Sequence, residues 1–232
     1  MIIAIEGLDG SGKHTQAEIL AECLKQEKGI NNVIILSYPK YGSPCCIAVE
    51  KFLKGDFGTD VERIDAYTAS TFFAIDRYAD YVEGWGKYYN PAMYVVVDRY
   101  VQSNMIHQMA KLHKEDWNKY IEWVEELEYK HNGLPKPDLT IYLDVPIEVS
   151  QKLMTQRYSG DENSKDIMER NLDYLAKCHC VAEYLSIRKN WRVINCTKND
   201  EMLSREEIAE QIKFYVKKQE KISNFELKYR KQ

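Results

Sequence analysis

Long apolar runs are missing from this sequence of 232 residues. No uninterrupted apolar stretch approaches the roughly 20 residues that a membrane-spanning helix needs. A strong excess of one charge is missing too, because 32 Lys and Arg stand against 36 Asp and Glu, for a formal net charge of -4. This balance argues against a nucleic-acid partner. Met1 leads directly into an apolar segment, so we expect a cytoplasmic protein with no secretory leader and no membrane partner.

The spacing of a zinc finger is missing as well, although the chain has six cysteines. Cys178 and Cys180 flank His179, and these three residues are an alternative metal site. Consecutive residues of a helix point in different directions, however. We therefore expect reduced, partly buried thiols, as in other cytosolic proteins.

An ordinary globular composition remains, 44% hydrophobic and 29% charged, which can bury the core of one large domain. Buried strands are predicted at residues 2–5, 33–36, 93–97, 139–143 and 191–195. Helices are predicted at residues 15–26, 44–54, 60–87, 103–111, 116–130 and 166–189, with another opened by Pro146. Strands that alternate with helices predict the α/β class, a five-stranded parallel sheet flanked by helices.

The C-terminal segment is predicted to be a helix capped by Ser204 and followed by a Lys-rich tail. A solvated helical face and a frayed terminus explain the lysines best. We therefore divide the chain into a main domain at residues 1–203 and a C-terminal helix with a basic tail at residues 204–232.

The sequence Gly-Leu-Asp-Gly-Ser-Gly-Lys at residues 7–13 fits the frame G-x-x-x-x-G-K of a phosphate-binding loop. It stands between the first predicted strand and the first predicted helix, as this motif requires. Glycines let the backbone approach a phosphate, and the loop N–H groups then face the anion. The predicted phosphate-binding residues are Gly7, Leu8, Asp9, Gly10, Ser11, Gly12, Lys13, His14 and Thr15.

His14 departs from this motif, which has Ser or Thr after the lysine as a ligand of Mg²⁺. A neutral imidazole is a poor ligand for so hard a cation. Mg²⁺ would then depend on phosphates, water and a distant carboxylate; alternatively, His14 only packs or points to solvent. Asp98 can hold water on Mg²⁺, and Arg99 beside it can bind a second phosphate. Alternatively, Asp98 and Arg99 form a buried pair that ties loops together.

Four segments together resemble thymidylate kinases. They are residues 6–13, Phe-Ala-Ile-Asp-Arg at 73–77, Asp-Arg-Tyr-Val-Gln-Ser-Asn-Met-Ile-His-Gln at 98–108, and Pro-Asp-Leu-Thr-Ile-Tyr-Leu-Asp-Val-Pro at 137–146. The resemblance extends from residue 1 to about residue 195. It implies a P-loop nucleoside-monophosphate kinase fold with a lid. It also implies a homodimer in which ATP, with Mg²⁺, phosphorylates dTMP to dTDP.

The resemblance implies roles for the matching residues. Phe73 would stack on the thymine ring, Arg77 would donate to thymine O4, and Asn104 would satisfy the N3–H group, with Gln108 close by. The implied substrate-binding residues are Asp9, Lys40, Phe73, Arg77, Arg99, Ser103, Asn104, His107 and Gln108. The implied catalytic residues are Lys13, Asp98, Arg99 and Arg157, with Asp98 holding the metal through water.

Arg99 would bind the acceptor phosphate, and Asp9 would lie at the 3′-hydroxyl side of the nucleotide. Two departures from the family pattern affect this end of the substrate. Lys40 stands where the family commonly has Arg, which removes a bidentate contact to phosphate. His107 replaces a Tyr near the sugar, which leaves the preference for a 2′-deoxy sugar open.

A catalytic arginine lies in the phosphate-binding loop of some family members and in the lid of others. Gly10 occupies the loop position here, and Arg157 begins the polar, glycine-containing segment at residues 157–166. The sequence is therefore identified as the type with a lid arginine, which can reach the moving phosphoryl group only when the lid closes. Alternatively, Arg157 is a solvated surface residue.

Two other functions remain alternatives. A deoxynucleoside kinase has a similar fold but needs a carboxylate base to activate a neutral hydroxyl group, and Glu6 is the obvious candidate. A non-catalytic nucleotide-binding protein is the other alternative, which His14 favours. Four residues argue against it, namely Lys13, Asp98, Arg99 and Arg157.

Overall fold

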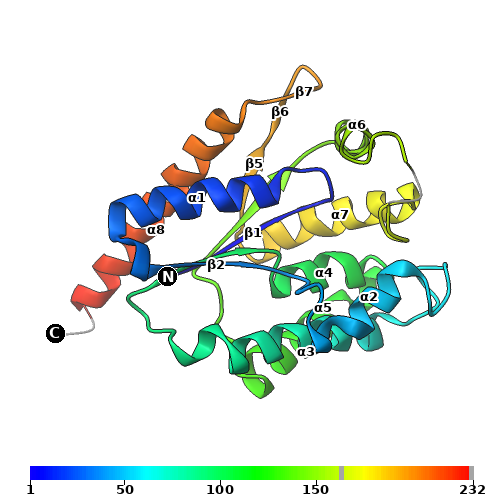
Figure 1. Ribbon diagram of the computed structural model, residues 1–232, viewed down its shortest axis with the longest axis horizontal. Helices are drawn as coiled ribbons and strands as arrows, with labels where there is room; N and C mark the ends of the chain where they lie inside the picture. Colours follow the sequence, from blue (N-terminus) through cyan, green and yellow to red (C-terminus); the bar gives the residue numbers. More distant parts are fainter. Residues whose placement is uncertain (162–164, 230–232) are drawn as a thin grey trace.

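The chain folds around one five-stranded sheet in the computed structural model, which describes residues 1–161 and 165–229 (Figure 1). The strands are β1 (Ile2–Gly7), β2 (Val33–Ser37), β3 (Tyr94–Asp98), β4 (Leu139–Asp144) and β5 (Arg192–Asn195). Their order is β2-β3-β1-β4-β5, and every pairing is parallel. The predicted fold class and its five strands are confirmed.

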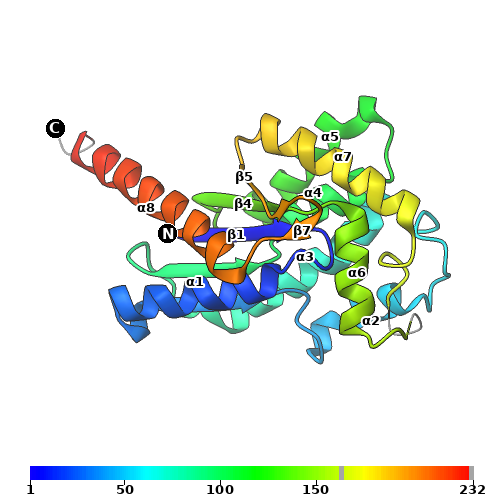
Figure 2. The same ribbon diagram turned by 90° about the horizontal axis from the view of Figure 1, so that it is seen from above.

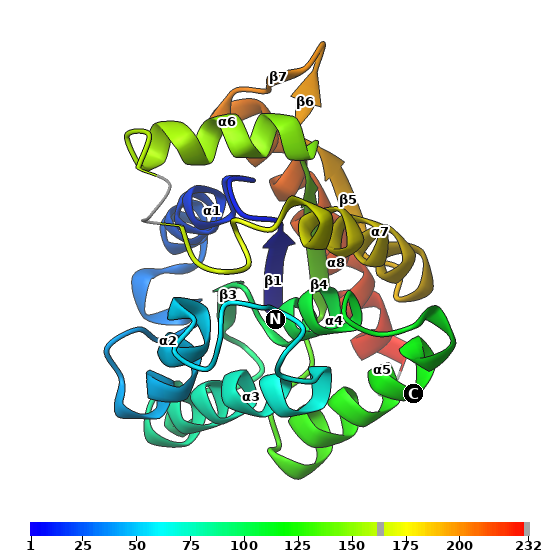
Figure 3. The same ribbon diagram turned by 90° about the vertical axis from the view of Figure 1, so that its right-hand side faces the viewer.

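Two layers of helices cover the sheet, because its strands are apolar on both faces. The helices are α1 (Lys13–Lys28), α2 (Ile47–Lys54), α3 (Ala66–Glu83), α4 (Val101–Met109), α5 (Trp117–Glu125), α6 (Ile147–Arg157), α7 (Leu172–Arg188) and α8 (Arg205–Tyr229). Ile3 and Ile5 pack with α1 and α8, whereas Ile2 and Ala4 face the layer that contains α3, α4, α5 and α7. Figure 3 shows α1 and α3 on opposite sides of β1.

Shorter elements connect these helices and strands. They are the 3-10 helices η1 (Ile30–Asn32), η2 (Pro44–Cys46), η3 (Trp85–Lys87) and η4 (Lys114–Asp116), the π-helix η5 (Glu126–His131), and the hairpin strands β6 (Thr197–Lys198) and β7 (Glu201–Met202). The sequence does not predict the hairpin or the π-helix. The π-helix follows α5 directly, and both lie in the region predicted as one helix at residues 116–130.

Two predicted helix starts are wrong because a side chain caps each helix later. The helix predicted at residues 60–87 begins at Ala66. The Asp65 carboxylate caps it by accepting hydrogen bonds from the amides of Tyr67 and Thr68 at 2.9 and 3.0 Å. The helix predicted at residues 166–189 begins at Leu172, since the Asn171 side chain accepts from the amide of Tyr174 at 3.0 Å.

Ser204 caps α8 as predicted. Its Oγ accepts from the amide of Glu207 at 3.2 Å, and the Glu207 carboxylate accepts from the amide of Ser204 at 2.9 Å. The first half of α8 packs against α1 through Ile208 and Ile212, and its second half extends beyond the sheet (Figure 2). The domain division at residue 203 stays a prediction, and the end of the predicted tail, residues 230–232, lies outside the described residues. Across the described ranges, no helix combines the length and apolarity needed to cross a membrane.

Candidate active site

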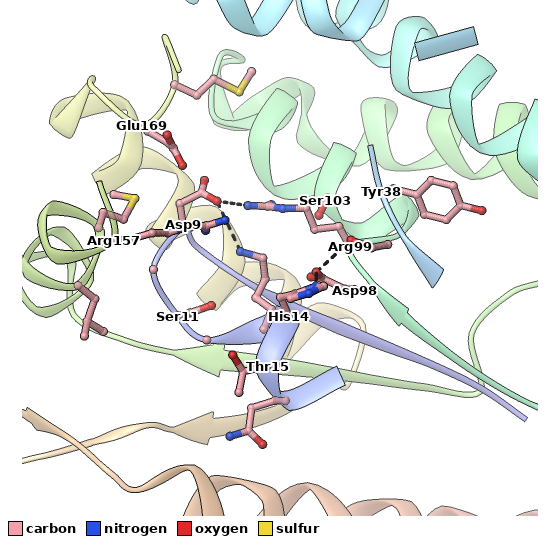
Figure 4. Close-up of a pocket in the computed structure, with 18 of the residues that line it drawn as sticks. Asp9, Ser11, His14, Thr15, Tyr38, Asp98, Arg99, Ser103, Arg157 and Glu169 are labelled. Atoms are coloured by element: carbon pink, nitrogen blue, oxygen red, sulfur yellow. Dashed lines mark hydrogen bonds and ion pairs between the residues drawn. The ribbon is translucent and has the colours of Figure 1, made fainter. Parts of the chain in front are cut away.

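A cavity of about 1140 Å³ lies at the carboxyl ends of β1, β2 and β3, where parallel sheets bind ligands (Figure 4). The predicted site residues that line it are Asp9, Gly10, Ser11, Gly12, Lys13, His14, Thr15, Phe73, Arg77, Asp98, Arg99, Ser103, Asn104, His107, Gln108 and Arg157. Gly7, Leu8 and Lys40 are not among the described lining residues. Lys40 instead points away, with its Nζ 3.4 Å from Asp80.

The loop between β1 and α1 has the backbone conformation that its glycines permit. Gly10 and Gly12 have φ angles of 79° and 82°, in the left-handed region that favours glycine. At Gly10 a Cβ would lie 2.5 Å from the carbonyl oxygen of Ser150 in α6, so the loop and α6 are in close contact. Lys13 is buried, and its Nζ donates to the Leu8 carbonyl at 3.1 Å. The ammonium group therefore lies inside the loop.

A charged row runs from this loop to α4. Asp9 forms an ion pair with Arg99, and Lys13 lies 3.6 Å from the same carboxylate. Burial alone would raise the pKa of Asp9, but Arg99 and Lys13 outweigh burial and lower this pKa. Arg99 also lies 3.3 Å from Nε2 of His107. Burial and then Arg99 lower the pKa of His107 to about 3, so the imidazole is neutral.

The proton of the neutral imidazole can be assigned to one ring nitrogen. A guanidinium group only donates hydrogen bonds, so Nε2 of His107 accepts from Arg99 and the proton is on Nδ1. Nδ1 lies 3.6 Å from Sγ of Cys178. His179, the next residue, turns instead to Asp144 at 2.8 Å. Cys178 and His179 thus contact different partners, which does not fit the alternative metal site.

Asp98 lies at the end of β3 and faces His14. Nδ1 of His14 is 3.1 Å from Oδ2 of Asp98, and Ser37 donates to the same oxygen at 3.2 Å. Oδ1 of Asp98 is buried and has no hydrogen-bond partner among the described residues. The His14 side chain is 65% exposed, so it both points to solvent and contacts the carboxylate that the sequence predicts as a metal ligand.

The far end of the cavity has an aromatic ring on one side. Phe73 of α3 packs edge-on against Phe52 of α2, with ring centroids 6.2 Å apart. Gln108 of α4 is fully buried, and neither atom of its side-chain amide has a partner among the described residues. This end of the cavity therefore combines a ring surface with polar groups that lack protein partners.

A buried network of four residues forms the rest of this end. Arg77 donates to both carboxylate oxygens of Glu128. The amide nitrogen of Asn104 donates to the Ser70 carbonyl and to Oε1 of Glu128, each at 3.2 Å. Burial would lower the pKa of Arg77, but Glu128 outweighs burial and raises this pKa. The guanidinium group is therefore charged, and Glu128 holds it through Nε and Nη2.

Glu128 is absent from the predicted site residues, although the sequence carries a signal for it. It follows Val124 by four residues and Ile121 by seven, so it continues the apolar face of a predicted helix. A charged residue on such a face needs a buried partner. The sequence alone does not identify Arg77, 51 residues away, as that partner.

Arg157 ends α6 and faces the cavity near Asp9 (Figure 4). Its guanidinium carbon lies 5.7 Å from the ring centroid of Tyr158, whose hydroxyl donates to Glu169 at 3.2 Å. Burial, followed by Asp9 and Glu169, raises the pKa of Asp166 to about 7. Asp166 and Glu169 line the cavity too but have no predicted role.

The predicted lid at residues 157–166 includes residues 162–164, which lie outside the described residues. Residues beyond the predicted set also line the opposite end of the cavity, near the phosphate-binding loop. They are Gln16, Leu153, Met202, Leu203, Ser204, Arg205 and Ile208. The hairpin and the start of α8 thus complete the cavity, and no sequence motif marks them.

Comparisons with known proteins point to one family. A family model described as thymidylate kinase matches residues 5–208. A thymidylate kinase from Mycobacterium tuberculosis is 34% identical over 178 residues, which are 75% of this chain and 79% of that protein. A probable thymidylate kinase from Saccharolobus solfataricus is 30% identical over 200 residues, covering 85% of this chain and 89% of that protein.

A solved structure shares the fold. The structure of a thymidylate kinase from Candida albicans superposes with a TM-score of 0.70 at 23% identity and covers 94% of this chain and 92% of that chain. The family model spans most of the chain and includes the phosphate-binding loop, the strand end at Asp98 and the residues of the predicted lid. This chain belongs to the thymidylate kinase family.

Proposed function

We propose that this protein transfers the γ-phosphoryl group of ATP to dTMP, giving ADP and dTDP for the synthesis of dTTP. The observation that carries the proposal is the hydrogen-bonding pattern at the base end of the cavity. Both hydrogens of the Asn104 amide are donated to Ser70 and Glu128, so its Oδ1 is left to accept. Arg77 engages Glu128 through Nε and Nη2, which leaves Nη1 to donate.

This pattern is complementary to thymine. Thymine presents a donor at N3 and an acceptor at O4, whereas cytosine presents an acceptor and a donor at the same positions. Asn104 would accept from N3–H while Arg77 donates to O4, and Phe73 would stack on the ring, a contact of about 1–3 kcal/mol. With cytosine, the acceptor oxygen of Asn104 would face the acceptor N3, and the donor of Arg77 would face the donor amino group. These two mismatches would exclude cytosine.

The two phosphate groups would meet between the loop and α4. The loop amides and Lys13 would hold the phosphates of ATP, and Arg99 would bind the phosphate of dTMP. Asp9 holds Arg99 in place and would lie near the 3′-hydroxyl of the sugar. Ser103, His107 and Gln108 line the same part of the cavity. Lys40 would contribute only after its side chain turns away from Asp80.

The proposal includes Mg²⁺, and the residues present fit it in part. Oδ1 of Asp98 is a hard oxygen donor without a partner among the described residues, as a water-mediated ligand of Mg²⁺ would require. The hydroxyl that the motif usually supplies is missing at His14. Mg²⁺ bound to ATP would offset phosphate charge, while Asp98 would orient its water and His14 would hold the other oxygen of Asp98.

We assign the catalytic lid cation to Arg157. The φ angle of Gly10 and its approach to Ser150 leave no room for a side chain in the loop, so an arginine cannot be accommodated there. Arg157, at the end of the helix that touches Gly10, lines the same cavity. Its charge would stabilise the transferring phosphoryl group when the lid closes.

The deoxynucleoside kinase alternative fits these contacts less well. Glu6, the candidate base, is fully buried and accepts from the Tyr100 amide at 2.7 Å and from the Ser103 hydroxyl at 2.6 Å. It is not among the described residues that line the cavity. A phosphate acceptor is already ionised and needs no such base.

A homodimer and a cytoplasmic location belong to the same proposal. Ile75, Tyr78 and Val82 of α3 are 54%, 43% and 47% exposed and form one stripe of the helix, and such a stripe can pack across a two-fold axis. The helix α4 is mostly buried within its own chain and offers less surface for such a contact. All six cysteines are free thiols, in keeping with a reducing compartment.

Product analysis tests the proposal. The protein is incubated with ATP and Mg²⁺ and with either dTMP or thymidine, and the nucleotides are separated by ion-exchange chromatography. We expect equal amounts of ADP and dTDP from dTMP and no product from thymidine. Faster phosphorylation of thymidine would replace the proposal with a deoxynucleoside kinase.

A further inference from the structure

We propose that Glu128 selects the nucleobase without touching it, by fixing the two side chains that read the base. This inference rests on the proposed function and adds a specificity-determining residue to it. Glu128 does not line the cavity in the described part of the chain, so it is a positioning residue rather than a catalytic one.

The geometry gives Glu128 two partners and no solvent. The side chains of Glu128 and Arg77 are 0% and 2% exposed. One carboxylate oxygen accepts from Nε of Arg77 at 3.2 Å, and the other accepts from Nη2 of Arg77 and from Asn104. Such a bidentate pair holds the plane of a guanidinium group as well as its charge.

The carboxylate also fixes the orientation of Asn104. An ionised carboxylate only accepts hydrogen bonds, so the atom of Asn104 beside Glu128 must be the amide nitrogen. That nitrogen also donates to the backbone carbonyl of Ser70 at 3.2 Å. The side-chain oxygen of Asn104 is therefore directed away from both acceptors, to the side on which Asn104 lines the cavity.

The local backbone brings Glu128 to this position. It lies in the π-helix η5, which follows α5 without a break. The amide of Asn132 bonds to the carbonyl of Leu127, five residues back, at 2.9 Å. A π-turn inserts one residue into a helix and is frequent at functional sites. In this chain it carries a buried carboxylate to α3 and α4, the two helices that bear Arg77 and Asn104.

Losing the carboxylate removes both constraints. A glutamine at position 128 could donate as well as accept, so Asn104 would be free to present its amide nitrogen to the base, as cytosine requires. Arg77 would lose its counter-charge and one of its fixed hydrogen bonds. The expected defect is therefore in base recognition, while the ATP site, which lies at the other end of the cavity, is unaffected.

The test compares Glu128→Gln with Glu126→Gln in the full chain. Glu126 lies on the same π-helix, is exposed and pairs with Lys130 at the surface. For Glu128→Gln we expect the KM for dTMP to rise by about 10- to 100-fold, the effect of one charge-assisted hydrogen bond. The ratio of kcat/KM for dTMP to that for dCMP should fall by at least about tenfold. The KM for ATP should change by less than about threefold, and Glu126→Gln should match the wild type.

A mutant cycle separates positioning from structure. If Glu128 acts through Arg77 and Asn104, adding Glu128→Gln to a chain that already carries Arg77→Ala and Asn104→Ala should lower discrimination against dCMP little further. Fully additive effects, or a folded Glu128→Gln variant with an unchanged dTMP to dCMP ratio, would overturn the inference. If Glu128→Gln does not fold, Glu128→Asp must raise the KM for dTMP alone, and an unchanged KM refutes the inference. A wild-type protein inactive on dTMP would instead refute the proposed function.

Discussion

Replacing Gly10 with alanine is expected to force the phosphate-binding loop away from α6. The φ angle of 79° at Gly10 costs a residue with a side chain about 1–2 kcal/mol. The new Cβ would lie 2.5 Å from the Ser150 carbonyl oxygen, whereas Cβ atoms essentially never approach closer than 3.0 Å. The loop or α6 must therefore shift by at least 0.5 Å, the difference between these two distances. An overlap of this kind adds about 1–3 kcal/mol.

Gly133→Ala is the matched control. Gly133 has a φ angle of 69°, but a Cβ there meets no atom within 4 Å, so this change carries the backbone strain without the overlap. One kcal/mol shifts the melting temperature of a chain of this size by about 2–4 °C. We expect Gly10→Ala to lower the melting temperature by about 10 °C and Gly133→Ala by about 4 °C.

Steady-state kinetics should show a second difference between these variants. A shift of half an ångström in the loop should lower kcat/KM for ATP by about tenfold in Gly10→Ala, and Gly133→Ala should keep the wild-type value. Equal losses of melting temperature in the two variants, together with an unchanged kcat/KM for ATP, would refute the argument that α6 excludes a side chain from the loop.

Three further predictions concern the lid and α3. Arg157→Ala should lower kcat by about 10³-fold or more with little change in either KM, because its contact forms mainly in the transition state; a near-normal kcat would contradict the lid assignment. Asp166 has a pKa raised to about 7, so the native state binds its proton more tightly and loses stability as pH rises from about 4 to 7. Asp166→Asn should therefore raise the melting temperature more at pH 8 than at pH 5, and an equal effect at both would be contrary evidence. Ile75→Asp should convert a dimer to a monomer in sedimentation, and a wild-type protein that sediments only near 27.2 kDa would exclude the dimer.

The parts of the fold that depend on local pattern could be predicted from the sequence. The strand at the N-terminus, the glycine loop and α1 follow from an apolar run, the need for positive φ and helical spacing within some 25 residues. Ser204 and Glu207 form the predicted cap for the same reason. The starts of α3 and α7 could not be placed, because Asp65 and Asn171 compete as caps with acidic or polar residues that fit helices equally well.

The site could be predicted only where a motif marks a residue. Arg77 and Asn104 come from the resemblance to the family, and both line the cavity. Glu128, which fixes them, is distant from both in the sequence. It also lies in a π-turn, and no residue pattern predicts where a π-turn occurs. Lys40 matches the family by position, yet Asp80 draws its side chain out of the cavity. Such long-range ion pairs depend on how helices pack.

The central claim is that the cavity reads thymine by an acceptor at Asn104 and a donor at Arg77. The most direct measurement is kcat/KM for dTMP, dUMP and dCMP at saturating ATP and Mg²⁺. The account predicts that dCMP is at least about 100-fold poorer than dTMP, whereas dUMP, which presents the same hydrogen-bonding edge, lies closer to dTMP than to dCMP. Phosphorylation of dCMP as efficient as that of dTMP would contradict it.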